Sequence, residues 1–211
     1  MKILYLDVET LPGDKEDSNL KLLYKKKLLK GSELSYEDYI RGTSFDGGFG
    51  RVLCIALAVN QDSVKCYCND KNEKKTLEQF WEVAKQIDLF VGHNALDFDL
   101  RFLWQRSIVL GVKPSWQDID SRAPRYLSFA RYRSSPVFDI MHEWVKWGRD
   151  NIGLEHIALA LGISSPKEGI DGSQVAAFYE AGKIEEICEY CKRDVETTRA
   201  IYKKMTFDEV R

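Results

Sequence analysis

The sequence contains no long apolar run. Its hydrophobic stretches are shorter than the roughly 18 residues that a membrane span requires. The N-terminus, MKILYLDVET, also lacks the charged region, apolar run and cleavage site of a signal peptide. With 211 residues, 44% of them hydrophobic, the chain is long enough for one well-packed domain and short for two. We therefore expect a single soluble, cytoplasmic domain over residues 1–211.

Positive charge is not in surplus either. The 31 lysines and arginines against 33 aspartates and glutamates leave a net charge of −2. No overall basic field therefore marks the chain as a nucleic-acid-binding protein. A polyanion would have to be bound by a local basic patch or through metal ions.

Cysteine is scarce, with five residues in the chain. An odd number disfavours a complete set of disulfides. The pairs Cys66/Cys68 and Cys188/Cys191 lack the second histidine or cysteine pair that a zinc site needs. We therefore expect reduced thiols, which is typical of a cytoplasmic protein.

Strand-like and helical segments alternate along the chain. The apolar residues 2–8 run into an acidic pair, as expected of a buried central strand whose end opens into a site. Residues 51–60 and 63–70 predict a hairpin in the same sheet. The amphipathic segment 77–87, followed by the strand-like segment 88–94, predicts a parallel neighbour of the first strand. These segments indicate an α/β fold with one mixed sheet.

The other segments are mostly helical. A helical insertion at residues 14–45, with Ser32 as a plausible cap, separates the first two strands. A later helix stops at Gly111, and residues 112–136 predict a long ordered loop, which at that length is usually functional or disordered. A short strand at 136–141 should follow. The last helices are expected around residues 142–147, 153–162 and 173–182 and from about 183 to 205.

Asp7 and Glu9 form the first candidate site. Because side chains alternate along a strand, both carboxylates lie on one face, opposite Val8, where they could hold a cation. A solvent-exposed strand end with a turn at Thr10 would explain the same spacing.

The C-terminal helix gives a sharper argument. Its apolar stripe includes Cys191 and Val195, and at 3.6 residues per turn Asp194 falls inside that stripe. Tyr190 lies one turn earlier on the same edge. A carboxylate that faces a core is costly unless it is paired or binds metal. The alternative to a metal ligand is a buried salt bridge from Asp194 to an arginine or lysine.

The third candidate is Asp99, at the first turn of a predicted helix that follows a strand. The helix dipole favours a carboxylate there in any case. Asp97 competes with it and is better placed to be the N-cap. Asn94 and His93 occupy the preceding loop, where His93 is expected to be a hydrogen-bonding residue rather than a ligand.

In order and context these elements resemble the DEDD superfamily of 3′-5′ exonucleases, which has a ribonuclease-H-like fold. The DVE of residues 7–9 matches its first motif, GHNALDFD of 92–99 its second, and YCKRD of 190–194 its third, in the tyrosine subclass. Segments such as FDIMHEW and LEHIALALGI resemble predicted exonucleases related to the proofreading domain of family-B DNA polymerases. The resemblance is weakest over residues 14–45.

This resemblance implies a metal-dependent exonuclease that releases nucleoside 5′-monophosphates. Asp7 would bridge two Mg²⁺ or Mn²⁺ ions, Glu9 and Asp194 would complete the shell of one, and Asp99 would hold the other, largely through water. Such ions, about 3.5–4 Å apart, would activate the attacking water and stabilise the leaving 3′ oxygen. Tyr190 would orient that water with its neutral hydroxyl.

The resemblance also implies contacts to the substrate. Asn94 matches the asparagine of the second motif, which is expected to support the substrate or the neighbouring carboxylate. Thr10 and Leu11 follow the first motif, where family members contact the terminal nucleotide. For Leu11, ordinary packing is the alternative.

A basic and aromatic stretch could add to these contacts. Residues 122–133, RAPRYLSFARYR, interleave arginines, among them Arg131 and Arg133, with tyrosine and phenylalanine. That composition suits phosphate contact and base stacking, although a solvated loop would have it too. The lysines at 25–27 fit a solvated helix face better than a nucleic-acid groove.

The expected substrate is the 3′ end of single-stranded or frayed DNA. One alternative is an exoribonuclease that trims RNA 3′ ends. The other is a catalytically silent module that binds nucleic acid or docks a partner nuclease, with the segment at 14–45 as a possible partner surface. The presence of all four acids and Tyr190 favours an enzyme.

Overall fold

A five-stranded mixed sheet lies at the centre of the structure, a computed structural model that describes residues 1–115, 131–164 and 170–208. The sheet order is β3-β2-β1-β4-β5. β1 pairs antiparallel with β2 and parallel with β4, and β2 and β3 form the expected hairpin. The predicted mixed sheet is thus confirmed. The strands are β1 (Ile3–Leu11), β2 (Arg51–Val59), β3 (Lys65–Cys68), β4 (Leu89–Gly92) and β5 (Val137–Asp139).

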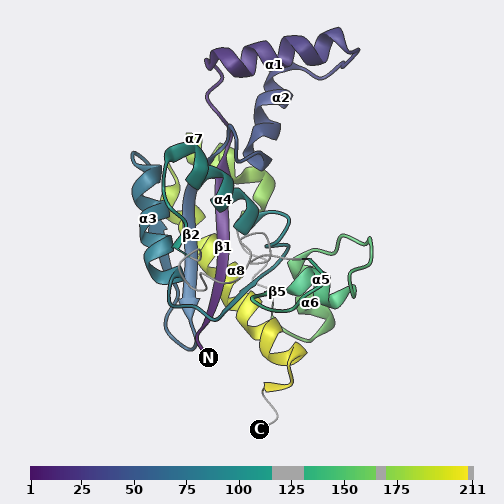
Figure 1. Cartoon of the computed structure of the whole chain (residues 1–211). Coiled ribbons are helices and arrows are strands. Elements are labelled where there is room, and N and C mark those ends of the chain that lie inside the picture. Colours follow the sequence, from purple (N-terminus) through teal and green to yellow (C-terminus); the bar gives the residue numbers. More distant parts are fainter. Residues whose placement is uncertain (116–130, 165–169, 209–211) are drawn as a thin grey trace.

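Helices cover both faces of this sheet (Figure 1). One hydrophobic cluster joins α3 (Glu73–Ala84) and α4 (Asp99–Leu110) to one face. A second cluster joins the long α8 (Ile184–Met205) and the shorter helices to the other face. The shorter helices on that side are α5 (Ile140–Trp144), α6 (Leu154–Ala160) and α7 (Val175–Glu180). In the described part of the chain, no helix is both long and apolar enough to cross a membrane.

The alternation along β1 decides which residues each cluster receives. Leu4, Leu6 and Val8 pack in the cluster with α3 and α4, whereas Tyr5 and Leu11 pack in the cluster with α8. Residues two apart on a strand share a face. The two acids of β1, which lie between Tyr5 and Leu11, are therefore on the face covered by α8.

Two helices lie where the helical insertion was predicted. They are α1 (Ser18–Leu29) and α2 (Tyr36–Gly42), and a 3₁₀ turn at Thr43–Phe45 follows them. Figure 1 shows them standing out beyond the end of the sheet at which β1 finishes. The cap of α2 is Ser35, not Ser32, because the Ser35 hydroxyl accepts the Asp38 amide at 3.1 Å.

The boundaries of α4 follow from its sequence. It begins at Asp99 and ends at Leu110, where Gly111 adopts a left-handed conformation with φ of 65°. Glycine has no Cβ to oppose this geometry, which commonly closes a helix. Arg106 of this helix forms a two-point ion pair with Glu73 of α3 (2.7 and 2.8 Å). The long loop predicted after Gly111 falls largely on residues 116–130, outside the described residues.

Candidate active site

The end of β1 supplies two carboxylates. Asp7 is partly buried and Glu9 is 8% exposed. A carboxylate oxygen from each and the Sγ of Cys191 on α8 all lie within 4.8 Å of one another. The pairing with β2 shifts register between Glu9 and Thr10, a β-bulge of the kind often found beside functional sites. The two acids therefore face one point between β1 and α8.

The middle of α8 supplies two further groups. The Tyr190 hydroxyl and the Asp194 carboxylate influence each other's pKa and so lie close together, as the one-turn spacing allows. On the same helix, the Cys191 thiol donates to the backbone carbonyl of Asp7 (3.4 Å). α8 is thereby held against β1 at the level of the acids.

The fourth carboxylate comes from the first residue of α4. Asp99 is 3% exposed, and its charge interacts with that of Asp7. The loop before it is held by Asp139 of β5, which accepts the backbone amides of Asn94 (3.1 Å) and Leu96 (2.9 Å). At the start of that loop a Cβ on Gly92 would lie 2.6 Å from the Cβ of Ala95. Glycine is needed there for the tight turn that leads to Asp99.

Asp97, the rival of Asp99, is engaged elsewhere. Its carboxylate contacts the Nε2 of His142 (3.0 Å) and forms an ion pair with Arg131. It is not the N-cap of α4, because that position belongs to Phe98. The structure thus groups Asp99 with the acids of β1 and turns Asp97 toward α5.

Burial raises the pKa of all four acids, and repulsion from neighbouring carboxylates adds to the rise for Asp7, Glu9 and Asp99. Burial, followed by the charge of Asp194, raises the pKa of Asp7 to about 7. Burial raises the pKa of Asp194 to about 6. The pKa values of Glu9 and Asp99 lie well above the usual range, because both are buried and both face Asp7. Negative charge in this cluster is unfavourable as long as no cation balances it.

The protein itself offers little to balance that charge beyond Arg193, whose positive charge lowers the pKa of Asp194. The Oδ2 atom of Asp7 is buried and has no hydrogen-bond partner. Within the described ranges, none of the four acids forms a salt bridge with a lysine or arginine. The salt bridge considered for Asp194 is therefore not found there. A set of buried carboxylate oxygens with an unpartnered atom at its centre fits a hard divalent cation.

The predicted substrate contacts are distributed unevenly. Thr10 lines a cavity of about 870 Å³ between the end of β1, α2 and α7, and its hydroxyl donates to the Ser44 carbonyl (2.7 Å). Leu11 is 2% exposed and packs in the core, and its contact with a terminal nucleotide stays a prediction. Asn94 has a positive φ of 56° in the loop before Asp99, a conformation that asparagine tolerates.

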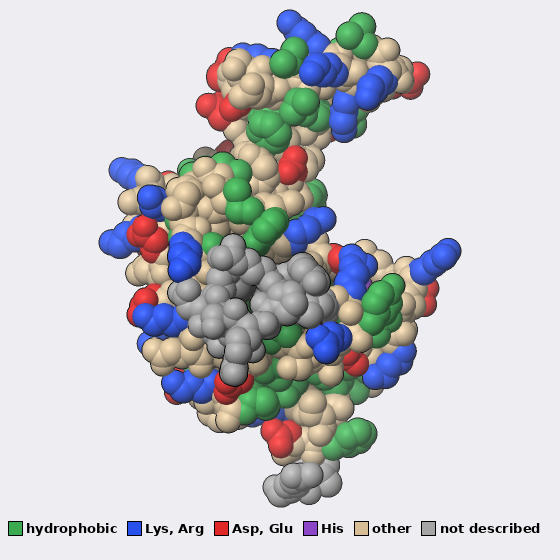
Figure 2. All heavy atoms as spheres, in the orientation of Figure 1, with side chains coloured by type: hydrophobic (Ala, Val, Ile, Leu, Met, Phe, Trp, Pro, Cys, Tyr) green, Lys and Arg blue, Asp and Glu red, His purple; other side chains and the backbone are tan. Residues whose placement is uncertain are grey.

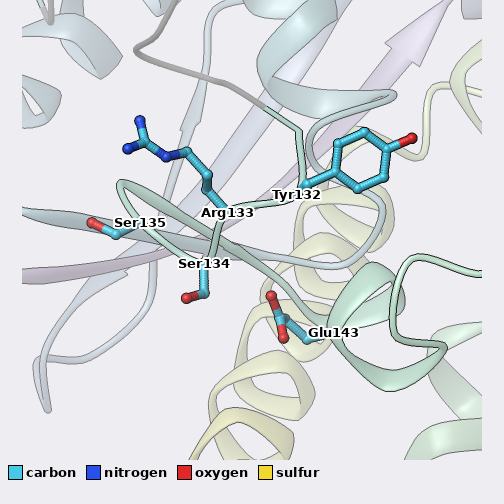
Figure 3. A pocket seen from close by; sticks show the side chains of 5 residues that line it. All are labelled: Tyr132, Arg133, Ser134, Ser135 and Glu143. Carbon is cyan, nitrogen blue, oxygen red and sulfur yellow. The ribbon is translucent and has the colours of Figure 1, made fainter.

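The two predicted arginines lie away from that cavity. Arg131 is paired with Asp97, as described above. Arg133 lines a separate cavity of about 580 Å³ with Tyr132 and Glu143, and its side chain points away from the Tyr132 ring (Figure 3). Residues 122–130 of the predicted stretch lie outside the described residues.

Sequence reasoning missed two residues that support the site. Asp139 is 1% exposed, caps α5 and holds the loop before Asp99. His142 is 7% exposed, stacks on Trp147 with ring centroids 4.6 Å apart, and contacts Asp97. Asp139 could have been found from the sequence, because it is an acid at the end of a short strand, as Asp7 is. His93, expected in the loop, is neutral because burial lowers its pKa to about 4.

Comparisons with known proteins identify the family of this fold. Residues 48–209 match a family described as a predicted 3′-5′ exonuclease related to the exonuclease domain of PolB. The match includes Asp99, Tyr190 and Asp194 and begins after the acids of β1. An uncharacterized protein of Methanocaldococcus jannaschii is 27% identical over 161 residues, which cover 71% of this chain and 83% of that protein.

A solved structure has the same fold. The family B DNA polymerase from the hyperthermophilic archaeon Pyrobaculum calidifontis superposes with a TM-score of 0.69 and 16% sequence identity. The similarity covers 98% of this chain and 24% of the polymerase chain, so this chain spans about a quarter of that protein's length. At this identity the likeness concerns the fold alone, and it agrees with the predicted α/β architecture.

The raised pKa values predict how the cation-free protein responds to pH. The ordinary pKa of an aspartate, 3.8, rises in the folded state to about 7 for Asp7 and to about 6 for Asp194. The folded state therefore binds more protons than the unfolded state between about pH 4 and 7. Stability in chelator should fall as the pH rises through this window. Asp7→Asn should remove part of this loss of stability. At pH 7 in chelator it should raise the melting temperature by a few degrees, which corresponds to an increase in the free energy of unfolding on the order of 1–3 kcal/mol.

Thermal denaturation in chelator at pH 5, 6 and 7 measures this effect. The exposed Asp62→Asn serves as the matched control and should follow the wild type at every pH. With Mn²⁺ at pH 7 the order should reverse, because the wild type gains more from the cation than Asp7→Asn does. An Asp7→Asn melting temperature at or below that of the wild type in chelator at pH 7 would contradict electrostatic strain in the cluster.

Proposed function

The chain belongs to the family of predicted 3′-5′ exonucleases related to the exonuclease domain of PolB, and we propose that it removes nucleotides from the 3′ end of single-stranded DNA. The reaction is hydrolysis of the terminal phosphodiester bond, and the product is a nucleoside 5′-monophosphate. The observation that carries this proposal is the convergence of four acids from β1, α4 and α8, of which Glu9 and Asp99 are buried and Asp7 and Asp194 partly buried, with a buried oxygen of Asp7 unpartnered.

These four acids would hold the cations. Asp7 is central, because its charge raises the pKa of both Glu9 and Asp99 and itself responds to Asp194. An acid that faces the other three is the natural bridge between two ions, with Glu9 and Asp194 on one side and Asp99 on the other. Two bound Mg²⁺ or Mn²⁺ ions would supply a water of lowered pKa and stabilise the charge of the transition state.

Tyr190 would position the attacking water. Burial and then the neighbouring charge of Asp194 raise its pKa above the ordinary range, so its hydroxyl keeps the proton at working pH. The effect of Asp194, Glu9 and Asp7 on its pKa places the hydroxyl beside the carboxylates. A neutral hydroxyl in that position can orient a water molecule but cannot abstract a proton from it.

The cavity of about 870 Å³ beside the end of β1 offers a place for the terminal nucleotides. It begins at Thr10, next to Glu9, and is also lined by Arg41 and Phe45. The Phe45 ring is 67% exposed and lies 5.9 Å from the ring of Phe98, the residue before Asp99. An exposed aromatic ring between the two acidic segments suits base stacking, and Arg41 suits a backbone phosphate.

The charge on the surface fits binding through the site rather than through a broad basic face. On the face shown in Figure 2, lysine and arginine side chains alternate with acidic ones over most of the surface and gather along α1. α1 carries four lysines and no acid, namely Lys21, Lys25, Lys26 and Lys27. The protein should therefore bind the 3′ end mainly through the acid-bound cations and the adjoining cavity.

We propose DNA rather than RNA as the substrate because the family is related to the exonuclease domain of PolB. The test is digestion of 5′-labelled single-stranded DNA and RNA of the same sequence, with Mg²⁺, Mn²⁺ or chelator. We expect stepwise shortening of DNA from its 3′ end that disappears in chelator. Asp7→Asn and Asp194→Asn should lower the rate roughly a hundredfold or more, because each removes a cation ligand.

The control is Asp62→Asn, purified in parallel, which should digest DNA at the wild-type rate. Cleavage in chelator, or wild-type rates in both Asp7→Asn and Asp194→Asn, would reject the proposed mechanism. Faster digestion of RNA than of DNA would instead show that the same site serves an enzyme that trims RNA 3′ ends.

Tyr190→Phe separates water positioning from cation binding. Loss of the hydroxyl should lower the single-turnover rate by roughly tenfold to a hundredfold, because the water loses one orienting contact. The stabilisation by Mn²⁺, measured as the shift of melting temperature, should stay at the wild-type level. Tyr202→Phe on the same helix is the matched control and should keep the wild-type rate. An equal loss of Mn²⁺ stabilisation and rate in Tyr190→Phe would show that the tyrosine supports the ligands instead.

A further inference from the structure

The five cysteines of the chain, which are far apart in sequence, form one cluster in the fold. Cys54 lies on β2, Cys66 and Cys68 on β3, and Cys188 and Cys191 on α8. The fold brings Cys66 and Cys188, one from each of the two sequence pairs, to Cys54. The partners that each pair lacks along the chain come from other elements of the fold.

The strand register explains how the cluster forms. Cys54 of β2 pairs directly with Cys68 of β3, and Ala56 pairs with Cys66. Directly paired residues of antiparallel strands project to the same face, and so do residues two apart on one strand. The three strand thiols therefore share the face that α8 covers, and Cys188 reaches them from the helix.

The thiols contact one another closely. The Sγ atoms of Cys54, Cys66 and Cys188 lie within 4.8 Å of one another. The pKa of the Cys188 thiol responds to Cys54, Cys66 and Cys68, which places Cys188 near all three. In a tetrahedral zinc site, with Zn–S bonds of about 2.3 Å, neighbouring sulfur atoms lie about 3.8 Å apart. The three thiols need to move only slightly to reach that geometry.

We propose that Cys54, Cys66 and Cys188 bind a Zn²⁺ ion, with Cys68 as the fourth ligand. Each thiol releases its proton to solvent when zinc binds, so the site consists of thiolate sulfur atoms around one Zn²⁺ ion. This site is distinct from the carboxylate cluster, because thiolate sulfur selects zinc over the hard cations Mg²⁺ and Mn²⁺, which carboxylate oxygens bind.

Cys191 has a different role. Its thiol donates to the backbone carbonyl of Asp7 (3.4 Å), and a zinc thiolate could not make that donation. It therefore stays a protonated thiol between the two sites. The other four thiols join β3, an edge strand of four residues, to α8.

A zinc ion there would have a structural effect on the site. Cys188 precedes Tyr190 by two residues, so anchoring it to β2 and β3 fixes the part of α8 that carries Tyr190 and Asp194. Lys192, in the same turn, forms an ion pair with Glu189 (2.7 Å), and its positive charge also interacts with Cys66 and Cys188. That charge offsets part of the negative charge of a four-thiolate site.

Metal analysis of the full chain tests the proposal. Protein expressed with zinc in the medium and desalted without chelator should contain about one zinc ion per chain. After zinc removal under reducing conditions, added Co²⁺ should produce the sulfur-to-cobalt charge-transfer absorption of a tetrahedral thiolate site. Cys66→Ser and Cys188→Ser, both at partly buried positions, should bind Co²⁺ roughly tenfold or more weakly.

Two controls separate this site from its neighbours. Cys191→Ser keeps a donor to the Asp7 carbonyl and should retain zinc and the cobalt absorption. Asp7→Asn should retain them as well, so failure of the carboxylate site and failure of the thiolate site give different results. Far-ultraviolet circular dichroism shows that each variant is folded.

Four results would overturn the proposal. The first is folded, reduced wild type without zinc and without a cobalt-thiolate absorption. The second is full zinc content in Cys66→Ser and Cys188→Ser. The third is a disulfide between these cysteines in freshly purified protein, found by mass spectrometry without reductant. The fourth is iron with acid-labile sulfide in place of zinc.

Discussion

Mutual repulsion within a cluster of four buried and partly buried carboxylates is the constraint on which the site depends. Asp7, Glu9, Asp99 and Asp194 come from three elements that the fold brings to one point; burial raises the pKa of all four, and neighbouring carboxylates raise it further for Asp7, Glu9 and Asp99. Such a cluster destabilises the folded protein unless a cation is bound. A divalent cation at the end of the central strand would relieve this repulsion, and the relief would add to the free energy with which the cation binds.

The surrounding structure holds that arrangement from several directions. The Cys191 thiol fixes α8 to the backbone of Asp7, and Asp139 holds the loop that ends at Asp99. Opposite these, α2 and the 3₁₀ turn after it form one wall of the cavity at Thr10. Catalytic groups held by packed elements lose less precision than groups on free loops. The segments at the end of β1 therefore combine a firmly held set of carboxylates with an adjoining cavity.

Much of this could be predicted from local pattern. Alternation along β1 places Asp7 and Glu9 on one face, and helical period places Tyr190 and Asp194 on one edge, because both periods are properties of the backbone. Spacing could not decide between Asp97 and Asp99, since that choice depends on contacts with Asp139 and His142, which are distant in sequence. The cysteine cluster could not be predicted from the sequence for the same reason. It depends on the pairing of Cys54 with Cys68 and on the position of α8 over the sheet, and neither follows from spacing along the chain.

The most direct test of the account is the location of Mn²⁺ in crystals of the protein, from anomalous diffraction at the manganese edge. The account predicts anomalous peaks among the carboxylates of Asp7, Glu9, Asp99 and Asp194, with Asp7 in contact with each peak. Well-ordered carboxylates with no peak between them at saturating Mn²⁺, or a lysine or arginine occupying their centre, would contradict it.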